Sequence, residues 1–339
     1  MPGRLRVERA RRRSGRVERQ GGSHGELVRV ADVGPADRDE RHGGPGGRAH
    51  DHDHGPTASR RHRPRAHRVV RGRQPAAGSR QLILSRSSRP LRTLVWYPAT
   101  GAAGGSPKAN APAASGRFPL VLFSHGLQAK PESYASITTT WAAAGFIVAA
   151  PAYPFTNGDS GDQFNAGDIV NQPADATAVI TAVLTLDTTS GDLLAGHIDA
   201  SRVAAGGHSA GGYTTVGELS GSTRDTRLSA GIVLSGGSLG SALSGPTTKL
   251  LFVHGDMDTT VPIASGRAVY NSTTWPKAFM TIIGGDHLSP VFNAGSASQA
   301  SEVTMLDFLR WALYGDGAAK ARLPGDATIA GKTSFESSL

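Results

Sequence analysis

The sequence predicts an α/β fold in which helices flank a doubly wound, mostly parallel β-sheet. Two observations support this fold class. Short apolar runs such as PLVLFSH (119–125) and FIVAAP (146–151) are typical of strands buried on both faces. Segments of helical character alternate with these runs along the chain, which is the order that parallel strands require.

The elements follow in order from about residue 80. The first two strands are expected at RQLILSR (80–86) and RTLVWYP (92–98). Pro131 suits the start of the first helix and Gly145 its end. The buried strands are expected at 119–125, 146–151, 202–209, 228–236, 249–256 and 278–285. The helices are expected at 131–145, 172–186, 211–220, 264–272 and 300–315.

Composition divides the chain into three segments. Residues 1–80 hold 20 of the 36 basic and nine of the 27 acidic residues, so the remainder is nearly neutral. Residues 1–79 are rich in Arg, Gly and His, and we expect them to be a disordered leader. The alternative is that the start codon has been assigned upstream of the true one, so that this segment is not part of the protein. One folded domain is expected at 80–325, and 326–339 is expected to be a polar C-terminal tail.

The absence of cysteine excludes disulfides, thiolate catalysis and Cys-ligated metals. No apolar run is long enough to span a bilayer, and no apolar signal segment follows the basic N-terminus. Localisation therefore stays open, and the protein would be exported only if its true start codon or leader differs from the one in this sequence. The leader could bind nucleic acid, or a metal weakly through His50, His52 and His54. For the nearly neutral body we expect a monomer with no nucleic-acid partner, metal or cofactor.

The sequence Gly207-His208-Ser209-Ala210-Gly211 matches G-x-S-x-G between an expected strand and an expected helix. In such a sharp turn a serine stands in a strained backbone conformation with its Oγ exposed, and small residues two before and two after allow the backbones to pack closely. The alternative is a glycine-rich turn with an ordinary serine. We interpret Ser209 as a nucleophile.

A serine hydroxyl needs a base, and in this architecture the order along the chain is serine, acid, histidine. Of the five histidines in the body, His287 alone follows both the serine and an expected late strand; the others are His125, His197, His208 and His254. The acid is expected in the loop HGDMDTTVP, where Asp258 is preferred and Asp256 remains an alternative that would cap the loop. Asp286, next to the histidine, is a poor geometric candidate.

The oxyanion that forms during acyl transfer needs two backbone donors. We expect them to be the N–H groups of Ala210, which follows the nucleophile, and Leu127, in the loop after the strand PLVLFS. The long loop 152–171 is expected to form one wall of the cleft, where Tyr153 and Phe155 would either stack on substrate or pin the loop. The connection 237–248 is too short for a large lid.

These motifs resemble those of the α/β-hydrolases, in particular dienelactone hydrolases, platelet-activating-factor acetylhydrolases and actinobacterial cutinases. The resemblance lies in VWYPA, FPLVLFSHGL, IDASRVAAGGHSAGG, GDMDTTVP and GGDHLSP, across about residues 92–315. It implies the α/β-hydrolase fold, Ser209, Asp258 and His287 as the catalytic triad, and Leu127 and Ala210 as oxyanion donors. Dienelactone hydrolases carry cysteine in place of Ser209. Cutinases carry an aromatic residue in place of Leu127, methionine in place of Ala210, a tryptophan where SGGSLGSALSG stands, and a C-terminal disulfide.

The function that follows is a serine carboxylester hydrolase for short-to-medium esters. The alternative within enzymes is a cutinase-like polyester hydrolase, including one that acts on aromatic polyesters such as poly(ethylene terephthalate). A serine peptidase is less favoured because no gating domain is evident. From other classes, the chain could be an inert binding protein that keeps the fold, or a nucleic-acid-binding protein that uses its basic leader.

Overall fold

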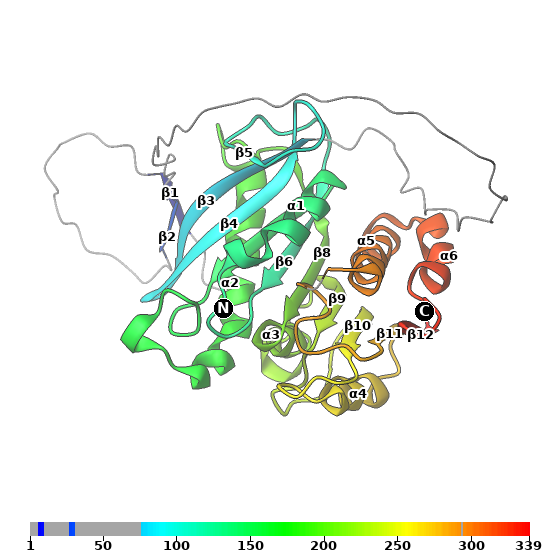
Figure 1. The fold of residues 1–339 in the computed structure, drawn as a ribbon. Coiled ribbons are helices and arrows are strands. Elements are labelled where there is room, and N and C mark those ends of the chain that lie inside the picture. Colours follow the sequence, from blue (N-terminus) through cyan, green and yellow to red (C-terminus); the bar gives the residue numbers. More distant parts are fainter. Residues whose placement is uncertain (1–5, 10–26, 31–75, 293) are drawn as a thin grey trace, which may run out of the picture.

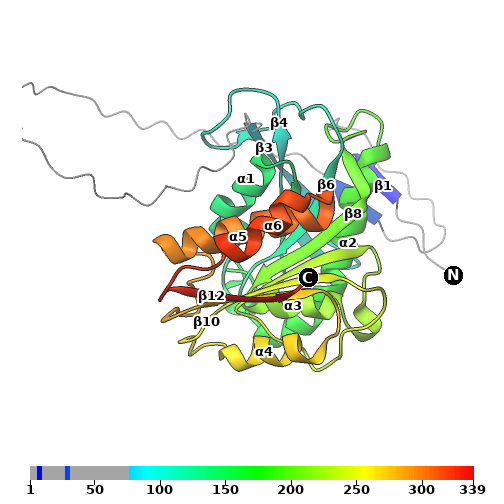
Figure 2. The ribbon, with the colours of Figure 1, turned by 90° about the vertical axis from the view of Figure 1, so that its right-hand side faces the viewer.

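The computed structural model describes residues 6–9, 27–30, 76–292 and 294–339. A ten-stranded sheet runs through the molecule, with helices on both of its faces (Figures 1 and 2). Its strands, in spatial order, are β12 (Thr333–Ser338), β11 (Lys277–Ile282), β10 (Lys249–Gly255), β9 (Leu228–Leu234), β8 (Ile198–His208), β6 (Phe118–Ser124), β7 (Ile147–Ala152), β4 (Arg89–Ala99), β3 (Ala76–Arg86) and β5 (Lys108–Ala109).

The six neighbouring strands β7, β6, β8, β9, β10 and β11 pair in parallel. Strand β4 pairs with β7, and β12 with β11, in antiparallel fashion. The sheet is therefore mostly parallel, with antiparallel pairs toward its edges. This confirms the predicted fold class.

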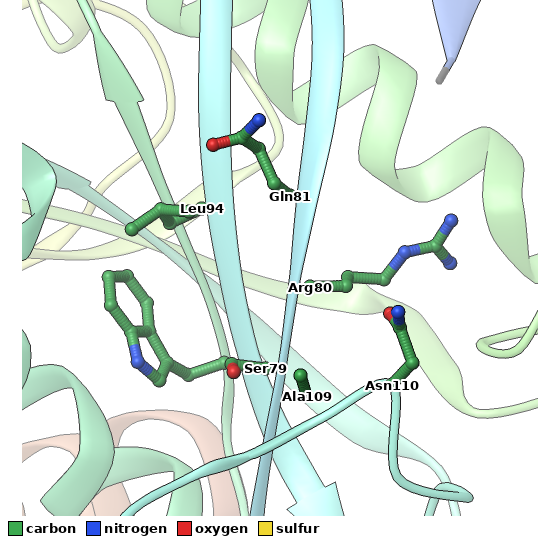
Figure 3. Close-up of a pocket in the computed structure, with 7 residues that line it drawn as sticks. Ser79, Arg80, Gln81, Leu94, Ala109 and Asn110 are labelled. Atoms are coloured by element: carbon green, nitrogen blue, oxygen red, sulfur yellow. The ribbon is translucent and has the colours of Figure 1, made fainter. Parts of the chain in front are cut away.

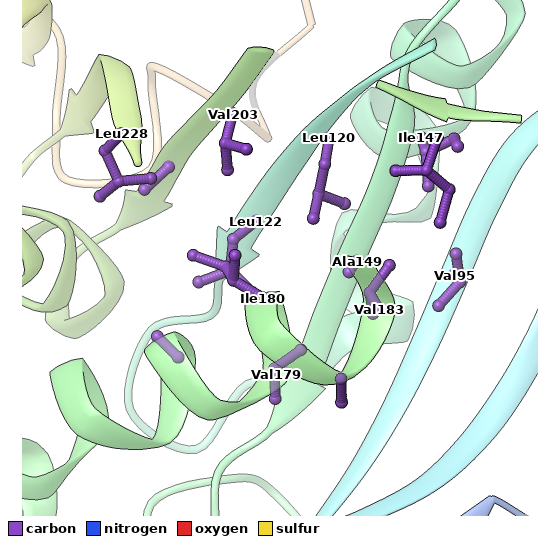
Figure 4. Packing of buried hydrophobic residues seen from close by; sticks show 14 of the residues in the cluster. Val95, Leu120, Leu122, Ile147, Ala149, Val179, Ile180, Val183, Val203 and Leu228 are labelled. Carbon is purple, nitrogen blue, oxygen red and sulfur yellow. The ribbon is translucent and has the colours of Figure 1, made fainter. Parts of the chain in front are cut away.

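Two hydrophobic cores lie on opposite faces of the sheet, because successive side chains of a strand point to opposite sides. On β6, Leu120 and Leu122 belong to one core, and Val121 and Phe123 to the other. The helices α2 (Gln172–Thr185), α3 (Ala210–Glu218) and α4 (Ile263–Ser272) contribute to the first core, which Figure 4 shows around Val179 and Ile180. The helices α1 (Ala135–Ala143), α5 (Ser296–Tyr314) and α6 (Gly317–Asp326) cover the other face.

Both ends of the folded domain extend beyond the expected boundaries. Strand β3 begins at Ala76, four residues before the expected start, and pairs with β4 along its whole length. The segment 326–339 is not a free tail, because β12 completes the edge of the sheet and Ile283 N–H donates to the Lys332 carbonyl. Strand β12 reads TSFESS and exposes most of its side chains, so it lacks the apolar pattern of a buried strand.

The expected leader lies largely outside the described residues. Within it, the structure describes the first residues of β3 and two short strands that were not expected, β1 (Arg6–Arg9) and β2 (Leu27–Val30), which pair in parallel. The candidate metal ligands His50, His52 and His54 lie outside the described residues, so the expectations for them remain predictions.

One helical stretch in the described part of the chain, Ala166–Thr188, is long and apolar enough to cross a membrane by length and composition alone. Half of it is buried inside the fold, where α2 packs against the sheet. A core helix passes the same test, so this stretch is weak evidence for a membrane span.

Glu218, the last residue of α3, is completely buried, and neither of its carboxyl oxygens has a hydrogen-bond partner in the described structure. Burial, and then the nearby Asp225, raise the pKa of Glu218 well above its usual value. The wild type should therefore lose stability as the pH rises from the usual carboxyl pKa of about 4.3 toward the folded-state value, because the unfolded chain releases this proton first. The expected slope is about 1.4 kcal/mol per pH unit.

Glu218→Gln removes this titration and keeps the side chain's shape, so its free energy of unfolding should become increasingly higher than that of the wild type as the pH rises. Urea unfolding at several pH values above the usual carboxyl pKa measures this difference. Glu302→Gln on α5 is the control, since Glu302 is partly exposed. Parallel pH profiles for wild type and Glu218→Gln would contradict the prediction.

Candidate active site

Ser209 stands at the turn between β8 and α3, at the carboxyl end of a central parallel strand. Its φ of 57° and ψ of −121° are values that residues other than glycine rarely adopt. The Ser209 N–H donates to the Leu234 carbonyl at 2.9 Å, which ties the turn to the end of β9. The predicted strained strand-to-helix turn is therefore present at this serine.

The glycines of the motif are required by the packing of this turn. A Cβ at Gly211 would overlap the Ser124 carbonyl at the end of β6, and a Cβ at Gly207 would overlap the Gly211 carbonyl. Neither clash can be relieved by moving a flexible side chain, because the opposing atoms belong to the backbone. The two positions therefore accept glycine alone at this spacing.

His287 and Asp258 come together from the loops after β11 and β10. The His287 Nδ1 lies 2.8 Å from Asp258 Oδ2, and the Asp258 side chain is completely buried. Its other oxygen accepts from the N–H groups of Thr260 and Val261, at 2.9 and 2.8 Å. Burial alone would raise the pKa of Asp258, but the hydrogen bonds from His287 and from Val261 outweigh it and hold this pKa below its usual value. Asp258 is therefore a carboxylate that can orient the imidazole.

The other two acidic candidates have structural contacts of their own. Asp256 Oδ1 accepts from the Gly284 N–H at 2.7 Å, so it joins the loops after β10 and β11, as expected for the capping alternative. Asp286 accepts from the Leu288 N–H and the Ser289 hydroxyl, within its own loop. Asp258 meets the His287 ring in a hydrogen bond.

The remaining histidines of the body have defined places. His254 Nε2 lies 3.2 Å from Asp258 Oδ2 and 2.8 Å from the Val261 carbonyl, which makes it a second, buried neighbour of Asp258. His125 is buried, accepts from the Tyr153 N–H, and has a pKa lowered to about 4 by burial. His197 contacts the Gly116 carbonyl, well away from Ser209 in the sheet.

The two expected oxyanion donors flank Ser209. Ala210 is the first residue of α3, where the N–H has no acceptor within its own helix. The Leu127 N–H has no hydrogen-bond acceptor in the described structure. Its loop lies against Ser209, since a Cβ at Gly126 would be 3.2 Å from the Ser209 Cβ.

The structure gives Tyr153 and Phe155 a different place from the cleft wall. Tyr153 is completely buried, and its hydroxyl shares a hydrogen bond of 2.8 Å with the Ser124 hydroxyl. Phe155 is partly buried beneath the Arg89 guanidinium, which lies 5.6 Å from the ring centre and also binds Asp168 and Asp175. Both rings therefore make intramolecular contacts of the kind expected for the loop-pinning alternative.

Exposed apolar side chains gather on the loops that carry the site. Leu127, Met257, Leu288 and Phe292 are 40, 65, 44 and 42% exposed, respectively. Leu127 lies in the loop after β6, Met257 in the loop after β10, and Leu288 and Phe292 in the loop after β11. The connection 235–248 between β9 and β10 contains no helix, in agreement with the expectation that no large lid is present there.

A separate pocket of about 200 Å³ lies on β3, β4 and β5, and Figure 3 shows its lining residues, which include Ser79, Gln81, Leu94 and Asn110. None of the predicted site residues lines it. Within 76–292 and 294–339, no group of three or more potential metal ligands is present.

Comparisons with known proteins agree with this architecture. The chlorophyllase family model matches residues 106–234, a segment that contains Ser209 and both oxyanion candidates but neither Asp258 nor His287. No curated protein sequence matches the chain significantly. Among solved structures, a ferulic acid esterase from Streptomyces cinnamoneus superposes with a TM-score of 0.57 at 18% identity, over 72% of this chain and 91% of the esterase. The strand order, the turn at Ser209 and this likeness together show that the chain has the α/β-hydrolase fold.

Proposed function

We propose that this protein is a serine carboxylester hydrolase with Ser209 as nucleophile, His287 as general base and Asp258 as the acid that orients it. The observation that carries the proposal is the 2.8 Å hydrogen bond between His287 and the buried Asp258, after the carboxyl ends of β11 and β10, in the same parallel sheet whose strand β8 leads into the strained Ser209 turn. The bond occupies Nδ1 of the imidazole and leaves Nε2 for the serine hydroxyl.

The reaction runs in two halves. Ser209 Oγ attacks the ester carbonyl while its proton moves to His287 Nε2, and the oxyanion accepts hydrogen bonds from the Leu127 and Ala210 N–H groups. The bond to the alcohol oxygen then breaks, and His287 returns the proton to the departing alcohol. A water molecule next attacks the acyl-enzyme in the same way, which releases the carboxylic acid and restores the serine.

The exposed apolar side chains around the site favour esters with an apolar acyl or alcohol part. Leu127, Met257, Leu288 and Phe292 offer surface for such groups without first displacing a lid. The same open surface favours a second candidate, a cutinase-like activity on polyesters, since a polymer chain could lie across it. The profile of rates over p-nitrophenyl esters of increasing acyl length, together with the acids released from a polyester film, separates the two.

The proposal is tested by covalent labelling. Diethyl p-nitrophenyl phosphate transfers its phosphoryl group to a serine that a base activates and releases p-nitrophenolate. We expect one equivalent of p-nitrophenolate per protein, and mass spectrometry should place the adduct on Ser209. Heat-denatured protein is the control and should stay unlabelled. Absence of an adduct from the folded protein, or an adduct on another serine, would exclude the proposed nucleophile.

A further inference from the structure

Two side chains outside the triad join the loops on either side of Ser209. The Gly126 N–H donates to the Tyr134 hydroxyl at 3.0 Å, and this hydroxyl lies 3.0 Å from His208 Nδ1. The other ring nitrogen of His208, Nε2, lies 2.8 Å from the backbone carbonyl of His287. A continuous chain of hydrogen bonds therefore runs from the residue before Leu127 to the proposed base.

The acceptors along this chain fix the positions of its protons. A carbonyl can only accept, so His208 Nε2 must carry the hydrogen toward His287. In a neutral imidazole, Nδ1 is then the acceptor and the Tyr134 hydroxyl its donor, while the hydroxyl oxygen accepts from Gly126. Each of these polar groups thus meets a complementary partner.

Burial keeps both side chains in these protonation states. Tyr134 and His208 are 1 and 3% exposed. Burial lowers the pKa of His208 to about 4, so the ring is neutral at neutral pH, and burial raises the pKa of Tyr134 to about 12, so the hydroxyl keeps its proton. Phe292 packs on both rings, with centroid distances of 5.0 Å to Tyr134 and 5.8 Å to His208.

The sheet does not connect these two loops directly. The oxyanion loop follows β6, the histidine loop follows β11, and three strands, β8, β9 and β10, lie between them. Both loops must nevertheless be placed accurately relative to Ser209, since a displacement of about 1 Å in a catalytic group can cost about a hundredfold in rate. The Tyr134–His208 chain spans this distance through side chains.

We propose that Tyr134 and His208 are positioning residues that fix the Leu127 donor and the His287 base relative to each other. This inference rests on the proposed function. It assigns a role to His208, the residue before the proposed nucleophile, whose ring centroid lies 4.8 Å from that of His287.

Conservative variants separate this role from simple packing. Tyr134→Phe keeps the ring on Phe123 and Phe292 but removes the hydroxyl from the chain. His208→Gln keeps a donor near the place of Nε2 and loses the acceptor for Tyr134. His208→Asn keeps an acceptor near the place of Nδ1 and loses the bond to the His287 carbonyl. Tyr97→Phe is the matched control, since Tyr97 lies on β4, away from the site, and its buried hydroxyl donates to the Ala111 carbonyl.

Steady-state kinetics on p-nitrophenyl butyrate, with thermal unfolding of each variant, tests the proposal. We expect Tyr134→Phe to lower kcat about tenfold and His208→Asn between tenfold and a hundredfold, with KM within about twofold of the wild type. His208→Gln should retain more activity than His208→Asn. The double variant Tyr134→Phe, His208→Gln should be no slower than the slower of its two single variants, because both lose the same bond.

Unchanged kcat in Tyr134→Phe and His208→Asn, losses confined to KM, or multiplicative losses in the double variant would overturn the positioning role while leaving an active esterase. A folded wild type that hydrolyses no ester and takes no label would instead overturn the proposed function. In either case, nitrogen-15 NMR of the histidine rings tests whether the hydrogen-bond chain exists, because it reports the tautomer of His208. The chain requires His208 in the Nε2–H tautomer, and the Nδ1–H tautomer would exclude it.

Discussion

Replacing Ser209 with alanine is expected to lower kcat/KM for ester hydrolysis by about a millionfold. The variant keeps the Leu127 and Ala210 donors and the Asp258–His287 pair, but it has no atom that can form the acyl-enzyme. The residual rate should be that of water attacking an ester held in the oxyanion hole. The measurement is release of p-nitrophenol from a short-chain ester, with enzyme concentrations high enough to detect the slow variant.

Ser235→Ala is the matched control for this experiment. Ser235 also follows a central strand with a positive φ, of 45°, and its buried hydroxyl has no hydrogen-bond partner in the described structure. Its replacement should leave kcat/KM within a few-fold of the wild type, because no step of the reaction uses it. More than about a hundredth of the wild-type activity in Ser209→Ala would remove Ser209 from the mechanism.

Replacing Asp258 with asparagine is expected to lower kcat by about ten-thousandfold. The amide keeps the size of the carboxylate and can still accept from Thr260 and Val261. It cannot stabilise the imidazolium that forms at His287, and its NH₂ group would favour the wrong ring tautomer. The loss should appear in kcat, because Asp258 does not contact the substrate in the proposed reaction.

Asp256→Asn, two residues away in the same loop, is the control for Asp258→Asn. Its carboxylate joins two loops through the Gly284 N–H, a bond that the amide oxygen of asparagine can also accept. We expect nearly unchanged kcat and a small loss of stability, measured by urea unfolding. If Asp256→Asn lost the activity and Asp258→Asn kept it, the assignment of the acid would be reversed.

The site residues differed in how far the sequence could locate them. Ser209 is marked by neighbours within two positions, and His287 by its order after the last central strand, so local pattern and topology were enough to propose both. The choice between Asp258 and Asp256 depends on which carboxylate the loop turns inward. The orientation of each carboxylate depends on its backbone donors. The N–H groups of Thr260 and Val261 hold Asp258, and the N–H of Gly284, in the loop after β11, holds Asp256. A one-dimensional pattern does not contain such contacts.

The fold shows the same division. Strands buried on both faces, such as β6 and β7, can be predicted from their continuous apolar sequence. Strand β12 cannot, because it lies at an edge of the sheet and has a mostly polar sequence. Tyr153 was expected to face either the substrate or its own loop, and only the packing around Ser124 and His125 decides for the loop. Tyr134 and His208 are 74 residues apart, and their contact has no local sequence signal.

The contrast between the glycines of the turn and the apolar residues around it bears on how this enzyme can diversify. Gly207 and Gly211 oppose backbone atoms, so mutational drift at these positions ends in lost folding. Leu127, Met257 and Leu288 each expose two fifths or more of their surface, and their replacement leaves the buried cores intact. Selection for a new ester, in nature or in a laboratory library, can therefore act on these three side chains while the chemistry beneath them stays unchanged.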